Sequence, residues 1–101
     1  MNKEKLRENI RLNLIALRVK KGITQADLAA ELNKGKTTIA SWEQGLSLPD
    51  VTTLYELSKF YRVDMDYFYN ENESIKQIER LEKYSQLLNK QREKVTKWLK
   101  N

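Results

Sequence analysis

A group of small polar residues near the middle of the chain can donate hydrogen bonds to a ligand that approaches closely. Residues 36–44 read KTTIASWEQ and follow the break NKG at residues 33–35. Successive residues of a helix turn by about 100°, which puts Ile39 and Trp42 on one side. The opposite arc then carries Lys36, Thr37, Ala40, Ser41 and Gln44. In a major groove, the lysine and the hydroxyls can donate to base edges, and the alanine can touch a thymine methyl.

Other kinds of chemistry find little support in the sequence. The chain contains no cysteine and no histidine, so we expect no disulfide, zinc finger or imidazole-based catalysis. The carboxylates Asp64 and Asp66 are close in sequence, but aspartate at such positions is typical of helix capping. We therefore expect no enzymatic activity, no metal and no cofactor.

Length and charge suit a small domain with a polyanionic partner. The 101 residues have room for one compact domain and a modest extension, and the formal net charge is +5. Residues 18–44 carry five bases against three acids, whereas residues 45–72 carry two bases against five acids. The N-terminal residues are charged and the longest apolar run is LIAL at 14–17, so we expect no signal peptide, no membrane span and a cytoplasmic location.

Hydrophobic spacing predicts the helices that must position the polar arc. Leu6, Ile10, Leu14 and Leu17 recur at helical spacing and predict a helix over 3–20, with Gly22 as its C-cap. A second stripe on the same helix, formed by Leu12, Ile15 and Val19, implies that another element covers it.

Capping residues divide the next part of the chain. Thr24 predicts the start of a helix over 25–32, and Asn33 tolerates the left-handed conformation of a sharp helix exit. Gly35 is a weaker N-cap for the helix over 36–44, which Gly45 ends.

A fourth helix and a short fifth one follow. Asp50 predicts a helix start, with Val51, Leu54, Leu57 and Ser58 on its inner side. Residues 61–64 are expected to turn, residues 65–69 to form a short helix that buries Val63, Met65 and Phe68, and residues 70–73 to form a polar linker.

The remaining segment is basic and amphipathic, with eight bases against four acids over residues 73–100. Leu81, Leu88 and Val95 fall seven apart. The interleaved positions hold Tyr84, Gln91 and Trp98 in one frame or Ser85, Arg92 and Leu99 in the other, and neither frame is a good coiled coil. Asn89 favours a break into helices over about 75–86 and 90–99, with one continuous helix as the alternative. We expect the segment to pack on helix 3–20 or to dimerise, and a DNA-binding arm is the less favoured interpretation.

Residues 10–68 resemble the lambda-repressor-like helix-turn-helix family of Cro and CI repressors and xenobiotic-response-element regulators. The resemblance is carried by GITQ at 22–25, LA at 28–29, Ile39, WEQG at 42–45, Pro49 and LS at 57–58. It implies an all-α fold, with a five-helix domain over 1–70 and a C-terminal amphipathic helical extension over 71–101. Leu46 and Leu48 depart from the polar loop usual in the family and favour an apolar subunit contact there.

The resemblance also assigns roles to residues. It makes Lys36, Thr37, Ala40 and Ser41 the base-contacting positions, and it pairs Arg18 with Glu43 as a structural brace. The residues expected to contact phosphates are Thr24, Gln25, Lys34, Thr38, Gln44, Arg18, Lys20 and Lys21.

The implied function is sequence-specific regulation of transcription. We expect a homodimeric repressor of phage or mobile-element type that binds a pseudopalindromic operator in double-stranded DNA. Restriction-modification controller proteins and antitoxin-type autoregulators are alternatives within the same class. A helix-turn-helix adaptor that contacts only proteins is the alternative from another class.

Overall fold

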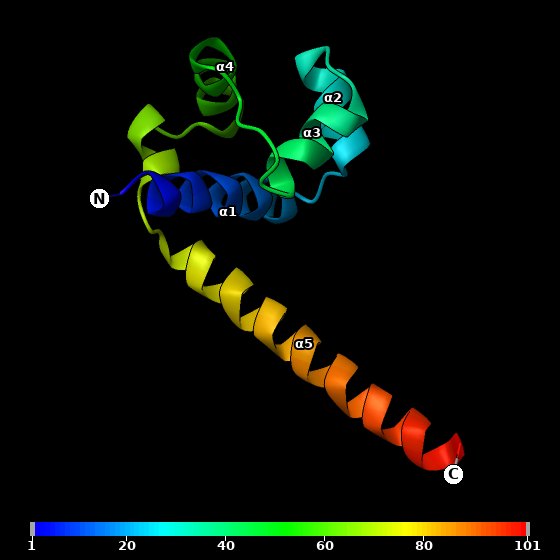
Figure 1. The fold of residues 1–101 in the computed structure, drawn as a ribbon. Helices are drawn as coiled ribbons and strands as arrows, with labels where there is room; N and C mark the ends of the chain where they lie inside the picture. Colours follow the sequence, from blue (N-terminus) through cyan, green and yellow to red (C-terminus); the bar gives the residue numbers. More distant parts are fainter. Residues whose placement is uncertain (1, 101) are drawn as a thin grey trace.

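The computed structural model describes residues 2–100, apart from the side chains of residues 74, 95, 96 and 98–100. The described part is all-α. Its elements are α1 (Lys3–Lys21), α2 (Gln25–Leu32), α3 (Lys36–Glu43), α4 (Val51–Tyr61), the 3-10 helix η1 (Met65–Tyr69) and α5 (Glu73–Lys100). Figure 1 shows α2 and α3 on one side of α1, with α5 leaving from the other side. None of the described helices is long and apolar enough to cross a membrane.

Local capping explains where the first helices begin and end. The Asn2 side chain accepts from the backbone of Lys5 at the start of α1, and Gly22 ends α1 with a φ of 76°. Thr24 and Asp27 form a reciprocal capping box at the start of α2, which satisfies two otherwise unpaired groups. Gly22 and Thr24 agree with the sequence-based predictions, whereas the roles of Asn2 and Asp27 were not predicted.

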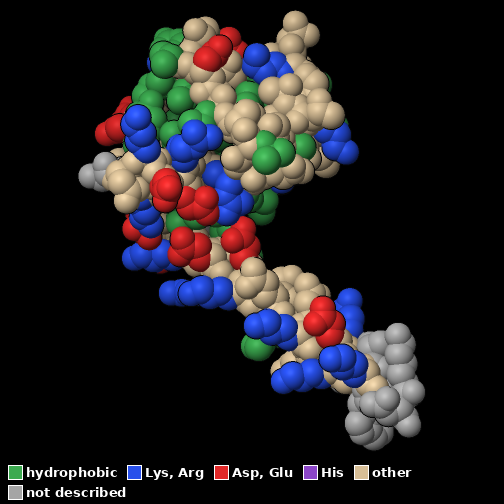
Figure 2. All heavy atoms as spheres, in the orientation of Figure 1, with side chains coloured by type: hydrophobic (Ala, Val, Ile, Leu, Met, Phe, Trp, Pro, Cys, Tyr) green, Lys and Arg blue, Asp and Glu red, His purple; other side chains and the backbone are tan. Residues whose placement is uncertain are grey.

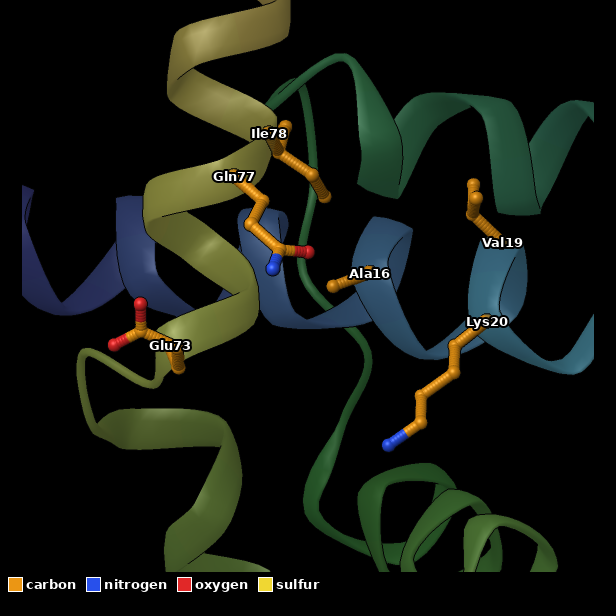
Figure 3. A pocket seen from close by; sticks show the side chains of 6 residues that line it. All are labelled: Ala16, Val19, Lys20, Glu73, Gln77 and Ile78. Atoms are coloured by element: carbon orange, nitrogen blue, oxygen red, sulfur yellow. The ribbon is translucent and has the colours of Figure 1, made fainter.

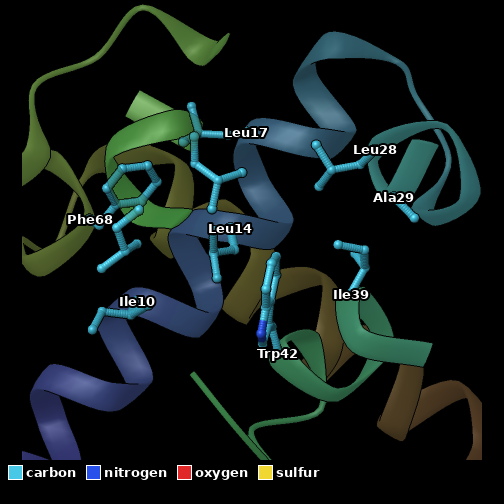
Figure 4. Close-up of a cluster of buried hydrophobic side chains, with 10 residues drawn as sticks. Ile10, Leu14, Leu17, Leu28, Ala29, Ile39, Trp42 and Phe68 are labelled. Carbon is cyan, nitrogen blue, oxygen red and sulfur yellow. The ribbon is translucent and has the colours of Figure 1, made fainter. Parts of the chain in front are cut away.

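One hydrophobic core joins α1 to the other helices of the globular part (Figure 4). Its most buried side chains are Ile10, Leu14 and Leu17 of α1, Leu28 and Ala29 of α2, Ile39 and Trp42 of α3, Leu54 and Leu57 of α4, and Phe68 of η1. The prediction that Val51 faces inward is wrong, because its side chain is 74% exposed. Val51 is the first residue of α4 and lies at the edge of the apolar face, where Thr53 is buried instead.

Residues 70–73 are not a simple polar linker, which corrects another prediction. The Asn13 side chain is fully buried, and its amide nitrogen lies 2.9–3.0 Å from the carbonyl oxygens of Tyr67, Phe68 and Asn70. Asn72 donates to the Asn13 side-chain oxygen at 3.0 Å. Asn13 and Asn72 therefore connect η1 and the start of α5 to α1 by hydrogen bonds, because buried carbonyl groups need donors.

The C-terminal segment forms one helix, and the favoured prediction of a break at Asn89 is wrong. Residues 73–100 contain no glycine or proline, and an asparagine inside a helix costs well under about 1 kcal/mol, too little to break it. The first turns of α5 pack on α1, where Ile75 is fully buried. The remainder projects outward, so the radius of gyration is 16.3 Å, compared with about 13 Å for a compact domain of this length.

The second apolar stripe of α1 is covered only in part. Leu12 is buried and Ile15 is half-buried, but Val19 remains 59% exposed. The C-terminal segment does pack on α1, as expected, but it leaves Val19 of the stripe uncovered.

Candidate nucleic-acid interface

The corner between α2 and α3 is built by backbone hydrogen bonds around a left-handed residue. Asn33 has a φ of 56°, and the backbone N–H of Lys34 donates to the carbonyl of Ala29 at 2.8 Å. Gly35 is the N-cap of α3 in an ordinary extended conformation and supplies no side-chain cap. The corner closes α2 against α3 within three residues and leaves the first backbone N–H groups of α3 without a side-chain acceptor.

The side chains of α3 separate into an inner and an outer face. Ile39 is completely buried and Trp42 is 4% exposed, so both belong to the core. On the outer face, Lys36 and Thr37 are exposed, whereas Ala40 and Ser41 are half-buried. An outer face with small side chains and a flexible ammonium group can approach a grooved polyanion closely.

Ser41 has a partner that the sequence did not reveal. Its hydroxyl oxygen lies 2.7 Å from that of Ser47 in the loop after α3. Either hydroxyl can be the donor, so one hydroxyl proton of the pair remains available for an outside acceptor. The pair ties the loop to α3 and fixes where the Ser41 hydroxyl lies.

The flanking residues lie around α2 and the two ends of α3. Lys34 and Gln44 are exposed, and Thr38 is half-buried. The Thr24 hydroxyl accepts from the Asp27 backbone N–H at 3.0 Å, and the Thr24 backbone N–H donates to the Asp27 carboxylate at 3.0 Å. Asp27 places a negative charge at the same helix end, and hydrogen bonds from Thr24 lower the pKa of that carboxyl.

Arg18 and Glu43 join α1 to the end of α3 through a two-pronged ion pair. The Arg18 Nε and Nη2 atoms donate to the two Glu43 carboxylate oxygens at 2.7 and 2.9 Å. Arg18 also donates to the Ile23 carbonyl at 2.8 Å, and the hydrogen bond to Glu43 raises the pKa of the guanidinium. The Glu43 side chain is only 8% exposed, so this pair is a brace within the structure rather than a free surface charge.

Gln25 belongs to the same brace. Its amide nitrogen donates to Glu43 Oε1 at 3.2 Å, so one of its two N–H groups is engaged inside the protein and the second is left for a phosphate. Its backbone N–H at the start of α2 still points out of the helix end, where a phosphate can accept from it.

Arg11 also takes part and was missed in the sequence. Its Nη1 donates to the carbonyl of Glu43, the last residue of α3, at 3.1 Å, while its other nitrogens bind Glu8. A cation is favourable at a helix C-terminus. Arg11 lies seven residues before Arg18, on the same face of α1, and that spacing was the available signal.

The structure does not bring Lys20 and Lys21 to the outer face of α3. Both line a hollow with Tyr61 and Arg62, on the side of α1 towards α4. The Lys21 ammonium lies 4.7 Å from the centre of the Phe60 ring, a cation–π contact. Among the described residues, no group of acidic side chains could hold a metal ion.

Comparisons with known proteins agree with this geometry. The model of the helix-turn-helix family matches residues 14–68, which span α2, the corner and α3. The chain is 37% identical over 73 residues to the HTH-type transcriptional regulator ImmR of Bacillus subtilis (strain 168), covering 72% of this chain and 54% of that protein. It is 40% identical over 50 residues to the HTH-type transcriptional activator BcrR of Enterococcus faecalis, covering 50% of this chain and 24% of that protein. The chain thus spans about half or less of the curated relatives it matches, and no solved structure gives a significant match.

Proposed function

This chain belongs to the Cro/CI-type helix-turn-helix family, and on that premise we propose that it is a sequence-specific DNA-binding regulator of transcription. The observation that carries the proposal is the outer face of α3, where Lys36, Thr37 and Ser41 surround Ala40 on a helix braced by Glu43. The brace matters because base readout requires a helix whose position is fixed relative to the DNA backbone contacts.

Lys36, Thr37, Ala40 and Ser41 contact base edges in this proposal. The backbone N–H groups at the start of α2, together with Thr24, Lys34, Thr38 and Gln44, bind phosphates on either side. Gln25 and Arg18 act mainly through the brace with Glu43, and Lys20 and Lys21 have no contact assigned. No cofactor and no enzymatic step is part of the proposal.

We further propose that the regulator is a homodimeric repressor of phage or mobile-element type. One recognition helix reads only a few base pairs, so a two-fold dimer on a pseudopalindromic operator gains affinity by placing two such helices about 34 Å apart. The relative BcrR is named as an activator, so whether this chain represses or activates transcription needs its own test. Lower transcription from a promoter that carries the selected site supports the repressor, whereas higher transcription contradicts it and leaves DNA binding intact.

Selection of binding sites from random duplexes tests the central proposal. We expect one preferred sequence with two half-sites and an affinity that falls steeply as salt rises. Lys36→Ala and Ser41→Ala should each weaken binding to that sequence by about 5- to 100-fold. The matched control is Lys59→Ala, because Lys59 is an exposed lysine of α4 that lies over the Tyr55 ring.

The competing functions give different outcomes. No preference for any sequence over random duplex would sink the DNA-reading proposal. If DNA binding is also insensitive to Lys36→Ala and Ser41→Ala, the adaptor that contacts only proteins is favoured. A neighbouring restriction-modification gene pair, or a toxin gene, would favour a controller protein or an antitoxin-type autoregulator over a phage-type repressor.

A further inference from the structure

The outer part of α5 is a long helix with few contacts to the rest of the chain. The 28 residues of Glu73–Lys100 give a rod about 42 Å long. Its α1-facing side carries the buried Ile75 and Glu82, which lies 3.7 Å from Arg11. Beyond Glu82, every residue whose side chain the structure describes is exposed.

A stripe of exposed side chains, apolar at three of its four positions, runs along α5. It consists of Leu81, Tyr84, Leu88 and Gln91, and we call it the α5 stripe. With Gln77 before it, the spacing alternates between four and three residues as in the seam of a coiled coil, although Gln77, Tyr84 and Gln91 are weaker seam residues than leucine. Leu81, Tyr84 and Leu88 are 67%, 61% and 43% exposed. Exposed leucines at this spacing on one face of a projecting helix offer a surface on which another helix can pack.

We propose that the α5 stripe is the dimer interface, on which α5 of a second copy lies parallel and in register. This inference rests on the homodimer of the proposed function and supplies its interface. Because the side chains of Leu81, Tyr84 and Leu88 are already exposed, a second helix can pair with the stripe without displacing α1.

The charges beside the stripe decide the orientation. Figure 2 shows Lys and Arg side chains along the described part of α5. A basic ridge follows one flank of the stripe at near-heptad spacing and consists of Lys76, Arg80, Lys83, Lys90, Lys94 and Lys97, all exposed. The other flank carries Ile78, Ser85 and Arg92.

In an antiparallel pair, like flanks meet and Arg80 approaches Lys94 of the second copy. In a parallel pair, each ridge meets the other flank, where Arg80 faces Ser85 and Leu87 faces Arg92 of the second copy. Opposed like charges destabilise a helix pair, so the charges favour the parallel arrangement. A parallel pair also keeps both helix-turn-helix parts at the same end of the rod, where they can face one duplex.

A hollow at the base of the stripe supports the same arrangement. A cavity of about 410 Å³ lies between α1 and α5 and is lined by Ala16, Val19, Lys20, Glu73, Gln77 and Ile78. Figure 3 shows Gln77 and Ile78 pointing from α5 towards Ala16. Since Gln77 begins the heptad spacing, the second copy's α5 starts at the mouth of this cavity and covers the exposed Val19.

Disulfide trapping tests both the interface and its orientation, and the chain contains no cysteine that would interfere. We expect Gln91→Cys to give a cross-linked dimer on mild oxidation, because two residues of the stripe in a parallel pair face each other. Gln86→Cys is the matched control, since Gln86 is an exposed glutamine on a different side of α5 and should not cross-link. In an antiparallel pair centred on the stripe, the two Gln91 positions are about 15 Å apart, beyond the roughly 7 Å limit of a disulfide.

A mixture of Leu81→Cys and Gln91→Cys chains detects the alternative. Cross-linking only between these two different chains would overturn the parallel arrangement. Replacing both Leu81 and Leu88 by Asn should weaken the dimer by about 100-fold in sedimentation, whereas Lys83→Asn with Lys90→Asn should leave it dimeric. A dimer that survives loss of both leucines would place the interface elsewhere, such as at the exposed Leu46.

The two proposals fail separately. If Gln91→Cys does not cross-link but the protein prefers one operator as a dimer, the interface is wrong and the function stands. If cross-linking succeeds and no DNA sequence is preferred, the interface stands and the proposed function is wrong. A wild-type chain that is monomeric and pairs only with an acidic protein helix would also overturn the interface between copies.

Discussion

The brace between Arg18 and Glu43 should show strong energetic coupling in a double-mutant cycle. Arg18→Met keeps the aliphatic stem and removes both bonds to the carboxylate, and Glu43→Gln removes the charge but keeps the shape. Arg18→Met also removes the bond to the Ile23 carbonyl, but this loss occurs in the single and the double variant and cancels in the cycle.

The expected magnitude follows from how far the pair is removed from water. The side chains of Arg18 and Glu43 are 17% and 8% exposed, so Arg18→Met leaves a nearly buried carboxylate with Gln25 as its main remaining donor. Breaking a fully buried pair costs about 3–5 kcal/mol, and the partial exposure of Arg18 reduces this to about 2–3 kcal/mol. Glu43→Gln keeps a neutral hydrogen bond and should cost about 1–2 kcal/mol. The double variant should therefore lose about 1–2 kcal/mol less unfolding free energy than the two single losses added together.

Urea unfolding followed by far-ultraviolet circular dichroism gives the four free energies of unfolding. The slope against urea should stay constant, because the substitutions do not change the surface exposed on unfolding. Arg18→Met should also lower the melting temperature by about 10–20 °C. Additivity of the two single losses within about 0.5 kcal/mol would refute the reasoning and reduce the pair to a surface contact.

Three further predictions concern substitutions of buried or helix-capping side chains. Asn13→Leu should destabilise the fold by about 2–4 kcal/mol in urea unfolding, because it leaves the carbonyls of η1 without their donor. Burial raises the pKa of Tyr61 to about 12, so the free energy of unfolding should fall from pH 10 upwards. Tyr61→Phe should abolish this fall. An alkaline stability profile that is unchanged in the variant would contradict the prediction. A hydrogen bond from Thr53 lowers the pKa of Asp50, so the ionised carboxylate stabilises the fold above the ordinary aspartate pKa, and this stabilisation is lost in more acidic solution. Asp50→Asn should therefore flatten the decrease of unfolding free energy at acidic pH.

The elements that the sequence predicted well are those set by neighbouring residues. Gly22 and Asn33 end helices because the chain must turn through a left-handed conformation there, and Thr24 and Asp50 begin helices through bonds to residues three positions later. The apolar face of α3 was equally predictable, because Ile39 and Trp42 fall on one side of any helix over those residues.

The features that the sequence did not predict depend on distant partners. Asparagine is an exposed residue in most proteins, and nothing local shows that Asn13 meets carbonyls more than fifty residues later. The engagement of Gln25 by Glu43 and the pairing of Ser41 with Ser47 likewise require the corner to be folded first. The prediction of a break in α5 was wrong because it treated Asn89 as a helix cap, although no glycine or proline follows Asn89 to end the helix.

Arg11 connects the surface proposed to read DNA with the helix proposed to form the dimer. Its guanidinium binds Glu8 of its own helix, the carbonyl at the end of α3 and, at 3.7 Å, Glu82 of α5. The hydrogen bond to Glu8 raises the pKa of Arg11, so the cation persists at every physiological pH and offsets the negative end of the α3 dipole. In the proposed dimer, pairing of the two α5 helices would fix the position of α5, which carries Glu82, and so restrict its partner Arg11. Dimerisation would then act on the end of α3 through one side chain, in addition to bringing a second recognition helix to the same duplex.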